Sequence, residues 1–143
     1  MNPVVIDTGV LVAGIFWHHE PHRCVQAWLC GSLTMVLSES IFSEYERVLQ
    51  EVKAEQNFAT DLDPWLRAIR TTALWVIPIP LREPVCRDPK DDMMIEAALA
   101  AGARVIIARD ADLTVLVRPF GIRILTPRQW LATLPRAERH KLG

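Results

Sequence analysis

Short apolar runs alternate along this chain with longer stretches in which the apolar residues have helical spacing. The short runs are rich in β-branched residues and carry no polar face, which is typical of parallel strands buried on both sides. Most of these runs are followed by a helix-start signal. The strands we predict are residues 4–6, 33–37, 74–79, 105–108 and 122–125.

The helices predicted between these strands begin at recognisable start signals. Pro21 opens a helix to about Cys30, Ser38 or Ser40 caps one to about Gln56, and Pro127 opens the last. The other predicted helices are 10–13 at the start of the chain, 60–73, the stretch from Asp91 to a stop at Gly102, and a short helix from Asp112 to about Val117. Strands alternating with helices predict an α/β fold: a mostly parallel five-stranded sheet with helices on both faces.

Length and charge refine this picture only slightly. A chain of 143 residues fits one domain, which we place at residues 1–134. Residues 135–143 form a basic C-terminal tail that we expect to be poorly ordered. The net charge of −1 gives no overall nucleic-acid signal, although the chain from Leu113 onward carries six Lys or Arg residues and one acid.

The cysteines and the N-terminal residues bear on the cellular compartment. Three cysteines without a C-x-x-C spacing, and no secretion signal, predict reduced thiols in the cytoplasm. The apolar run 4–16 is interrupted by Asp7, Gly9 and Gly14 and is too short to span a bilayer. We therefore expect a cytoplasmic protein without a membrane segment.

Acidic residues gather in the stretch Arg87–Leu113. On a helical wheel, Asp91 shares the face of Met94, Ile95 and Ala98, so its carboxylate points along the buried stripe. A carboxylate in that position is unfavourable unless something neutralises its charge, and a divalent cation would do so. Asp88 and Asp92 are explained equally well as acids that cap the helix.

Other acids follow the predicted strands. Asp110 and Asp112 come directly after strand 105–108, and Asp7 follows strand 4–6. Ligand sites in open α/β sheets lie beyond the carboxyl ends of the strands. The same acids can also cap the next helix, so one of them can cap while another binds.

Two further patterns in the sequence allow more than one interpretation. Glu44 and Glu46 lie at opposite edges of the apolar stripe of their helix, and the wheel does not choose between them. His18 and His22 have i, i+4 spacing, but Pro21 lies between them, so we interpret them as loop histidines rather than metal ligands.

Carboxylates that meet at one place would bind Mg²⁺ or Mn²⁺ rather than zinc, because hard oxygen ligands select hard cations. Such a site can activate water for attack on a phosphodiester. Basic residues nearby could hold a nucleic-acid backbone, and nothing in the sequence suggests reading of bases. The basic candidates are Arg82, Arg87, Arg109 and Arg118.

These segments resemble the PIN-domain family, and in particular VapC-like toxins of bacterial toxin–antitoxin systems. The resemblance rests on V-V-I-D-T-G-V-L-V-A-G, S-E-S-I-F-S-E-Y-E-R-V-L, D-P-K-D-D-M-M-I-E-A-A-L-A-A-G-A-R-V-I-I-A-R-D-A-D-L and R-I-L-T-P-R-Q-W-L, in that order. It implies a PIN-like three-layer sandwich and an Mg²⁺- or Mn²⁺-dependent ribonuclease that cleaves single-stranded RNA. It also implies a homodimer inhibited by a cognate antitoxin protein.

By position, the resemblance implies roles for individual residues. The four family acids fall on Asp7, Glu44, Asp91 and Asp110 as catalytic residues. The expected metal ligands are Asp7, Asp91, Asp110 and Asp112, the last as an accessory ligand, and the expected substrate-binding residues are Thr8, Arg87 and Arg109.

This sequence departs from the family at two positions. Asn is common where Gly9 stands, and a hydroxyl residue is common where Ala108 stands. These departures support an alternative hypothesis, a non-catalytic PIN-like module that binds RNA or a partner protein.

Overall fold

The computed structural model describes residues 1–116 and 118–142 and has five parallel strands in one sheet, ordered β3-β2-β1-β4-β5. The strands are β1 (Pro3–Ile6), β2 (Thr34–Leu37), β3 (Leu74–Trp75), β4 (Val105–Ile107) and β5 (Arg123–Leu125). β1 lies at the centre, with Val4 paired to Met35 of β2 and to Val105 of β4. The predicted α/β fold with a parallel five-stranded sheet is confirmed.

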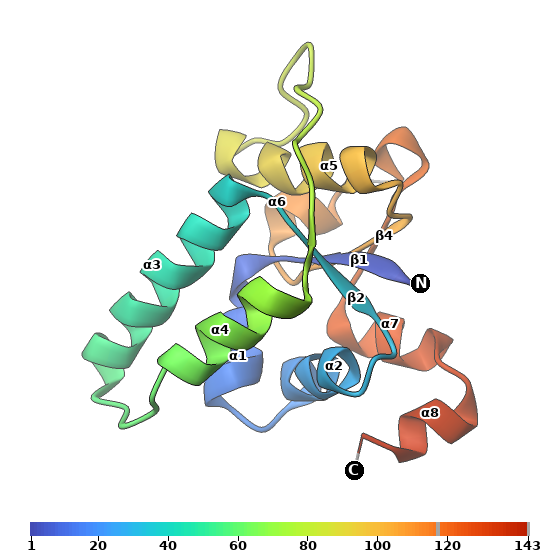
Figure 1. The fold of residues 1–143 in the computed structure, drawn as a ribbon. Coiled ribbons are helices and arrows are strands. Elements are labelled where there is room, and N and C mark those ends of the chain that lie inside the picture. The colour runs from blue at the N-terminus through green and yellow to red at the C-terminus, as the bar shows by residue number, and fades with distance from the viewer. Residues whose placement is uncertain (117, 143) are drawn as a thin grey trace.

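Helices cover both faces of the sheet, as Figure 1 shows. α5 lies on one face, and α1, α2 and α4 lie on the other. α3 packs against both α1 and α5. The helices are α1 (Thr8–Phe16), α2 (Glu20–Leu29), α3 (Glu39–Gln56), α4 (Asp63–Thr72), α5 (Pro89–Ala101), α6 (Ala111–Thr114), α7 (Pro127–Thr133) and α8 (Arg136–His140), with a 3-10 turn η1 (Pro119–Gly121).

The core lies between these layers. The side chains of β1, β2 and β4 are almost all inaccessible to solvent, which explains why these runs lack a polar face. α5 adds Met94, Ile95 and Ala98, the residues that share the wheel face of Asp91. The side chain of Tyr45 is also buried, and its hydroxyl donates a hydrogen bond to the carbonyl oxygen of Ile6 at the end of β1.

The third strand is shorter than predicted. Only Leu74 and Trp75 pair with β2, whereas the sequence pattern predicted a strand over 74–79. Val76 N–H still donates to the Leu37 carbonyl at 2.8 Å, but Pro78 has no N–H to continue the ladder. The chain then leaves the sheet, forms a loop that projects beyond α5, and returns to begin α5 (Figure 1).

The C-terminal residues are better ordered than predicted. Residues 136–140 form α8, and the Leu142 side chain is only 1 % exposed, so the expectation of a poorly ordered tail is wrong there. The predicted end of the short helix, Val117, and the last tail residue, Gly143, lie outside the described residues. Within the described residues, no helix is long and apolar enough to cross a bilayer.

Candidate metal and phosphodiester site

The carboxyl ends of β1 and β4 place acids from both strands at one edge of the sheet. Asp7 follows β1, and its N–H donates to the Ile107 carbonyl at 2.8 Å, which fixes it beside the end of β4. The Asp7 carbonyl then accepts from Val10 and Leu11 and starts α1. Asp110 follows β4 and caps α6, accepting from the Asp112 N–H at 2.8 Å. Asp110 therefore combines helix capping with a place at the site.

The start of α5 supplies the third side of the site. Asp88 is the N-cap and accepts from the Lys90 N–H at 3.0 Å, which is one of the two roles that the sequence left open for it. Asp91, in the first turn, is 8 % exposed, and its Oδ2 has no hydrogen-bond partner in the described chain. A buried carboxylate oxygen without a partner is unfavourable unless a cation compensates it.

Asp91, Asp110 and Asp112 each place one carboxylate oxygen within 4.8 Å of the others. Three acids this close repel one another unless a cation is bound. An all-oxygen set of this kind fits a hard divalent cation. The unpartnered Asp91 Oδ2 and the neighbouring carboxylates of Asp110 and Asp112 therefore fit a binding site for a divalent cation.

A pocket of about 540 Å³ surrounds the acids. Asp7 and Glu44 line it together with Asp91 and Asp110, although Asp7 lies outside the compact group of three. The complete lining is Asp7, Thr8, Gly9, Glu44, Val48, Asp88, Lys90, Asp91, Arg109 and Asp110. The structure thus brings all four predicted catalytic acids to one cavity, with Glu44 rather than the exposed Glu46 facing it.

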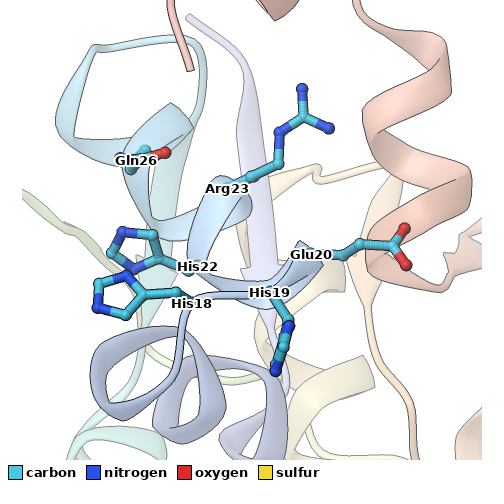
Figure 2. A pocket seen from close by; sticks show the side chains of 6 residues that line it. All are labelled: His18, His19, Glu20, His22, Arg23 and Gln26. Atoms are coloured by element: carbon cyan, nitrogen blue, oxygen red, sulfur yellow. The ribbon is translucent and has the colours of Figure 1, made fainter. Parts of the chain in front are cut away.

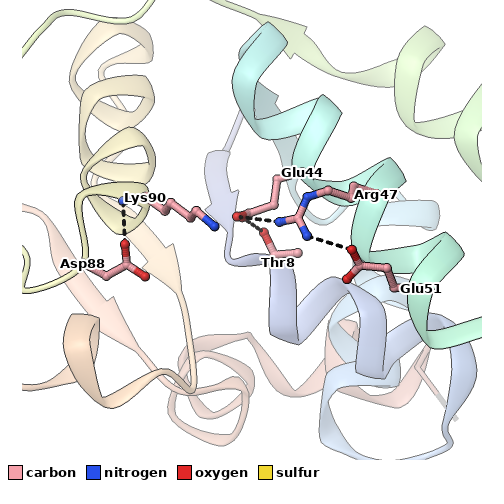
Figure 3. Close-up of polar contacts among 6 residues, drawn as sticks. All are labelled: Thr8, Glu44, Arg47, Glu51, Asp88 and Lys90. Carbon is pink, nitrogen blue, oxygen red and sulfur yellow. Dashed lines mark hydrogen bonds and ion pairs between the residues drawn. The ribbon is translucent and has the colours of Figure 1, made fainter. Parts of the chain in front are cut away.

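Glu44 is held by two neighbours (Figure 3). The Thr8 hydroxyl donates to Glu44 Oε2, and Arg47 Nη2 lies 3.7 Å from Glu44 Oε1. Arg47 is in turn paired with Glu51 at 3.0 Å. Lys90 extends its side chain from α5 toward Thr8 and Glu44 (Figure 3), which adds a positive charge that the sequence analysis did not identify.

The arginines predicted to hold the substrate do not all line the acidic pocket. Arg109 lines the acidic pocket, but Arg87 does not, although it stands next to Asp88. Arg82 lies on the loop before α5, and Arg118 lines a cavity near β5. The only sequence signal for Lys90 was its position between the helix N-cap and Asp91.

Asp92 has a structural role that the sequence did not reveal. Its carboxylate accepts hydrogen bonds from Cys86 N–H at 2.7 Å and Val85 N–H at 3.2 Å. It is buried and anchors the preceding loop to α5. The interpretation of Asp92 as a helix-capping acid is therefore incomplete.

Burial and mutual repulsion raise the pKa values of two of the acids. Burial, followed by the charge of Asp110, raises the pKa of Asp7 to about 6. Burial, followed by the charges of Asp110 and Asp7, raises the pKa of Asp91 to about 7. Both carboxylates resist ionisation in the absence of a cation.

These shifts predict a pH dependence of stability. In the unfolded chain both acids titrate near the ordinary value of about 4, so between about pH 4 and 7 the folded state binds more protons. The unfolding free energy contributed by these acids therefore falls as pH rises through that window. Thermal unfolding in chelator should show wild type losing stability relative to Asp91→Asn as pH rises. Added Mn²⁺ should stabilise wild type more at about pH 7.5 than at about pH 5, because protons compete with the cation.

A difference between wild type and Asp91→Asn that does not change with pH would contradict these shifts. The comparison with the variant matters because other acids also titrate in this range, and they do so in both proteins.

Comparison with protein families matches residues 3–112 to the PIN domain. The chain belongs to the PIN-domain family. The match spans the chain from β1 to Asp112 and includes every acid described above. PIN domains are generally metal-dependent nucleases, and the cluster of Asp91, Asp110 and Asp112 is compatible with that activity. A search among curated proteins finds no match to this chain.

Gly9 and Ala108, the two positions at which the sequence departs from the family, differ in their distance from the acidic pocket: Gly9 lines it and Ala108 does not. At Gly9, an added Cβ would lie 3.9 Å from Asp7 Oδ2, so the pocket has room where Asn is common. Ala108 is fully buried after β4 and does not line the pocket. Gly9 is therefore the departure that changes the surroundings of the acids.

Proposed function

We propose that this PIN-domain protein is an endoribonuclease that uses Mg²⁺ or Mn²⁺ to cleave single-stranded RNA. The observation that carries the proposal is the buried, unpartnered Oδ2 of Asp91 beside Asp110 and Asp112. A non-catalytic module has no need to keep an uncompensated carboxylate buried in an acidic pocket.

In this proposal Asp91, Asp110 and Asp112 hold the cation, with Asp7 as a further ligand. A bound divalent cation would activate water and stabilise charge at a phosphodiester. Without a cation the pKa of Asp7 is raised to about 6, so near neutral pH Asp7 would be ionised and able to serve as a ligand. Glu44, held by the Thr8 hydroxyl and by Arg47, would add a further carboxylate to the same pocket. Arg109 and Lys90 attract the phosphate.

The biological setting extends the same proposal. The sequence resemblance to VapC-like toxins supports a toxin of a toxin–antitoxin pair, acting in the cytoplasm as a homodimer and inhibited by a cognate antitoxin. Growth arrest on expression, relieved by co-expressing the product of the neighbouring gene, would support this role. Normal growth despite ribonuclease activity in vitro would argue against it.

The activity itself is tested with labelled single-stranded RNA, the same RNA as a duplex, and single-stranded DNA, each with Mn²⁺ and with chelator. We expect Mn²⁺-dependent cleavage of the single-stranded RNA, and loss of at least about 100-fold in Asp7→Asn. Replacing residues that only orient metal ligands already costs about 10–100-fold. Equal cleavage by wild type and Asp7→Asn, or cleavage in chelator, would reject the site as described. Mn²⁺ binding without any cleavage would favour the non-catalytic module.

A further inference from the structure

Two further cavities lie near the acidic pocket. Arg109 lines both the acidic pocket and a cavity of about 290 Å³. His19 and Glu20 line that cavity and also a third of about 610 Å³. Each cavity shares lining residues with the next, so the three are neighbours on one part of the surface. We call the second and third cavities the basic track; its lining outside the acidic pocket includes Arg128, Thr126, His18, His22, Arg23 and Gln26.

The walls of the basic track are parts of packed helices. α2 contacts α7, and the Cys24 thiol of α2 approaches the Pro127 carbonyl oxygen at 4.0 Å. Burial raises the pKa of this thiol to about 12, so it remains a donor. Thr126 caps α7 through a reciprocal pair of hydrogen bonds with Gln129. A surface fixed in this way can position a ligand without first becoming ordered.

His18 and His22 line the far end of the track, at and just before the start of α2. His22 lies within α2 rather than in a loop, which corrects the sequence interpretation, and its Nδ1–H donates to the Gly14 carbonyl at 2.7 Å. The rings of His18 and His22 lie edge to face with centroids 4.7 Å apart. Figure 2 shows these two rings side by side and Arg23 extending in another direction.

Among the residues that the structure describes, the arginines of the basic track form no ion pair. Within residues 1–116 and 118–142, the ion pairs are those of Arg47 with Glu44 and Glu51. Arg23, Arg109 and Arg128 thus have no carboxylate oxygen of the described part of the chain within 4 Å. In addition, the Arg23 Nε is buried and has no acceptor within the described chain. Guanidinium groups left without acceptors suit phosphate, which they bind through paired hydrogen bonds.

Glu20 is the only carboxylate among the described residues that line the two cavities. It lies in the first turn of α2, where the helix dipole favours an acid. An anion in the track would be repelled by Glu20, so this residue gives a test in which binding should improve.

We propose that the basic track holds the phosphate backbone of single-stranded RNA on one side of the bond that is cleaved. The inference rests on the proposed function, because Arg109 lines both the track and the pocket where cleavage would take place. An RNA strand is favoured over an acidic peptide, because the track adjoins a site suited to phosphodiester chemistry. The arginines would carry the affinity without selecting bases.

The test measures binding of fluorescent oligouridine by anisotropy in chelator, so that binding does not depend on a metal. We expect Arg128→Gln and Arg23→Gln each to weaken binding by roughly tenfold, the value of a hydrogen bond to a charged group. Each should also lower the slope of log affinity against log salt by about 0.7, the value for one phosphate contact on a single strand. Glu20→Gln should strengthen binding.

Arg104→Gln is the matched control, because Arg104 is exposed and lies just before β4, at the opposite end of the sheet from Asp110. It should bind like wild type. Thermal unfolding identifies any variant that fails to fold, and Arg128, being exposed, is the variant least subject to that problem. A second readout is cleavage with Mn²⁺ of RNAs lengthened on the 5′ or the 3′ side. Wild type should gain in kcat/KM on one side only, and Arg128→Gln should lose that gain.

The outcomes separate this proposal from the proposed function. Oligouridine binding that depends on Arg23 and Arg128, without cleavage, would support the track and reject the nuclease. Cleavage by wild type with unchanged binding in Arg128→Gln and Arg23→Gln would overturn the track alone. Equal losses in Arg104→Gln would also overturn it, because they would show a general charge effect. Binding of polyglutamate in place of oligouridine, with the same arginine dependence, would assign the track to an acidic peptide and overturn the proposal.

Discussion

Asp91→Asn should abolish Mn²⁺-dependent RNA cleavage while leaving the protein folded. The substitution keeps the shape of the side chain but removes the charge that the proposed cation compensates. We expect a loss greater than about 100-fold in kcat/KM, more than is typical for residues that only orient metal ligands. In chelator at about pH 7.5, the variant should unfold at a higher temperature than wild type, because it no longer buries an uncompensated carboxylate. Single-stranded RNA cleavage and thermal unfolding measure the two effects.

Asp88→Asn is the matched control for this prediction. Asp88 lines the same pocket and begins the same helix, but it is exposed and serves as the N-cap. Asn caps helices about as well as Asp, so stability should change little. Similar activity losses in both variants would mean that the general negative charge of the pocket matters rather than Asp91 itself. Full activity in Asp91→Asn would contradict the site.

Gly14→Ala should destabilise the fold by about 2 kcal/mol or more. A Cβ at Gly14 would lie 2.4 Å from Val25 Cγ2 and 2.6 Å from the Pro21 carbonyl oxygen. Overpacking of this kind costs about 1–3 kcal/mol, and a backbone oxygen moves less easily than the end of a side chain. The better helix propensity of Ala recovers at most about 1 kcal/mol. The change should also disturb the hydrogen bond from His22 to the Gly14 carbonyl. Chemical denaturation measures the difference.

Gly9→Ala, in the same helix, is the internal comparison. Its Cβ would meet only Asp7 Oδ2, at the ordinary contact distance of 3.9 Å. We expect a neutral or slightly stabilising effect, up to about 1 kcal/mol. Equal destabilisation by the two changes would show that the close approach of α1 and α2 at Gly14 is not what determines stability.

Periodicity predicted the parts of the fold in which burial alone decides the structure. The β-branched runs at β1 and β4 became central strands, and the wheel placed Asp91 on the buried face of α5. The third strand was predicted too long because an apolar run does not show whether hydrogen-bond partners exist. Pro78 removes the donor that would have continued pairing with β2.

The candidate site was harder to predict, because several of its properties come from neighbours distant in sequence. The wheel could not choose between Glu44 and Glu46, since both lie at stripe edges, and only the packing of α3 beside α1 brings Glu44 to Thr8. Asp92 looked like a capping acid because its partners, Val85 and Cys86, lie on a loop without regular structure. Lys90 was missed because periodicity gives the face on which a residue lies, but not which neighbouring element a long, exposed side chain reaches.

We propose that Asp91, Asp110 and Asp112 share a divalent cation. The most direct test is a crystal grown with Mn²⁺ at about pH 7.5, above the raised pKa values of Asp7 and Asp91, with the ion located by its anomalous scattering. We expect an anomalous peak in contact with Asp91 Oδ2 and with carboxylate oxygens of Asp110 and Asp112. A peak elsewhere, or a pocket that stays empty of Mn²⁺ in well-ordered crystals, would contradict it.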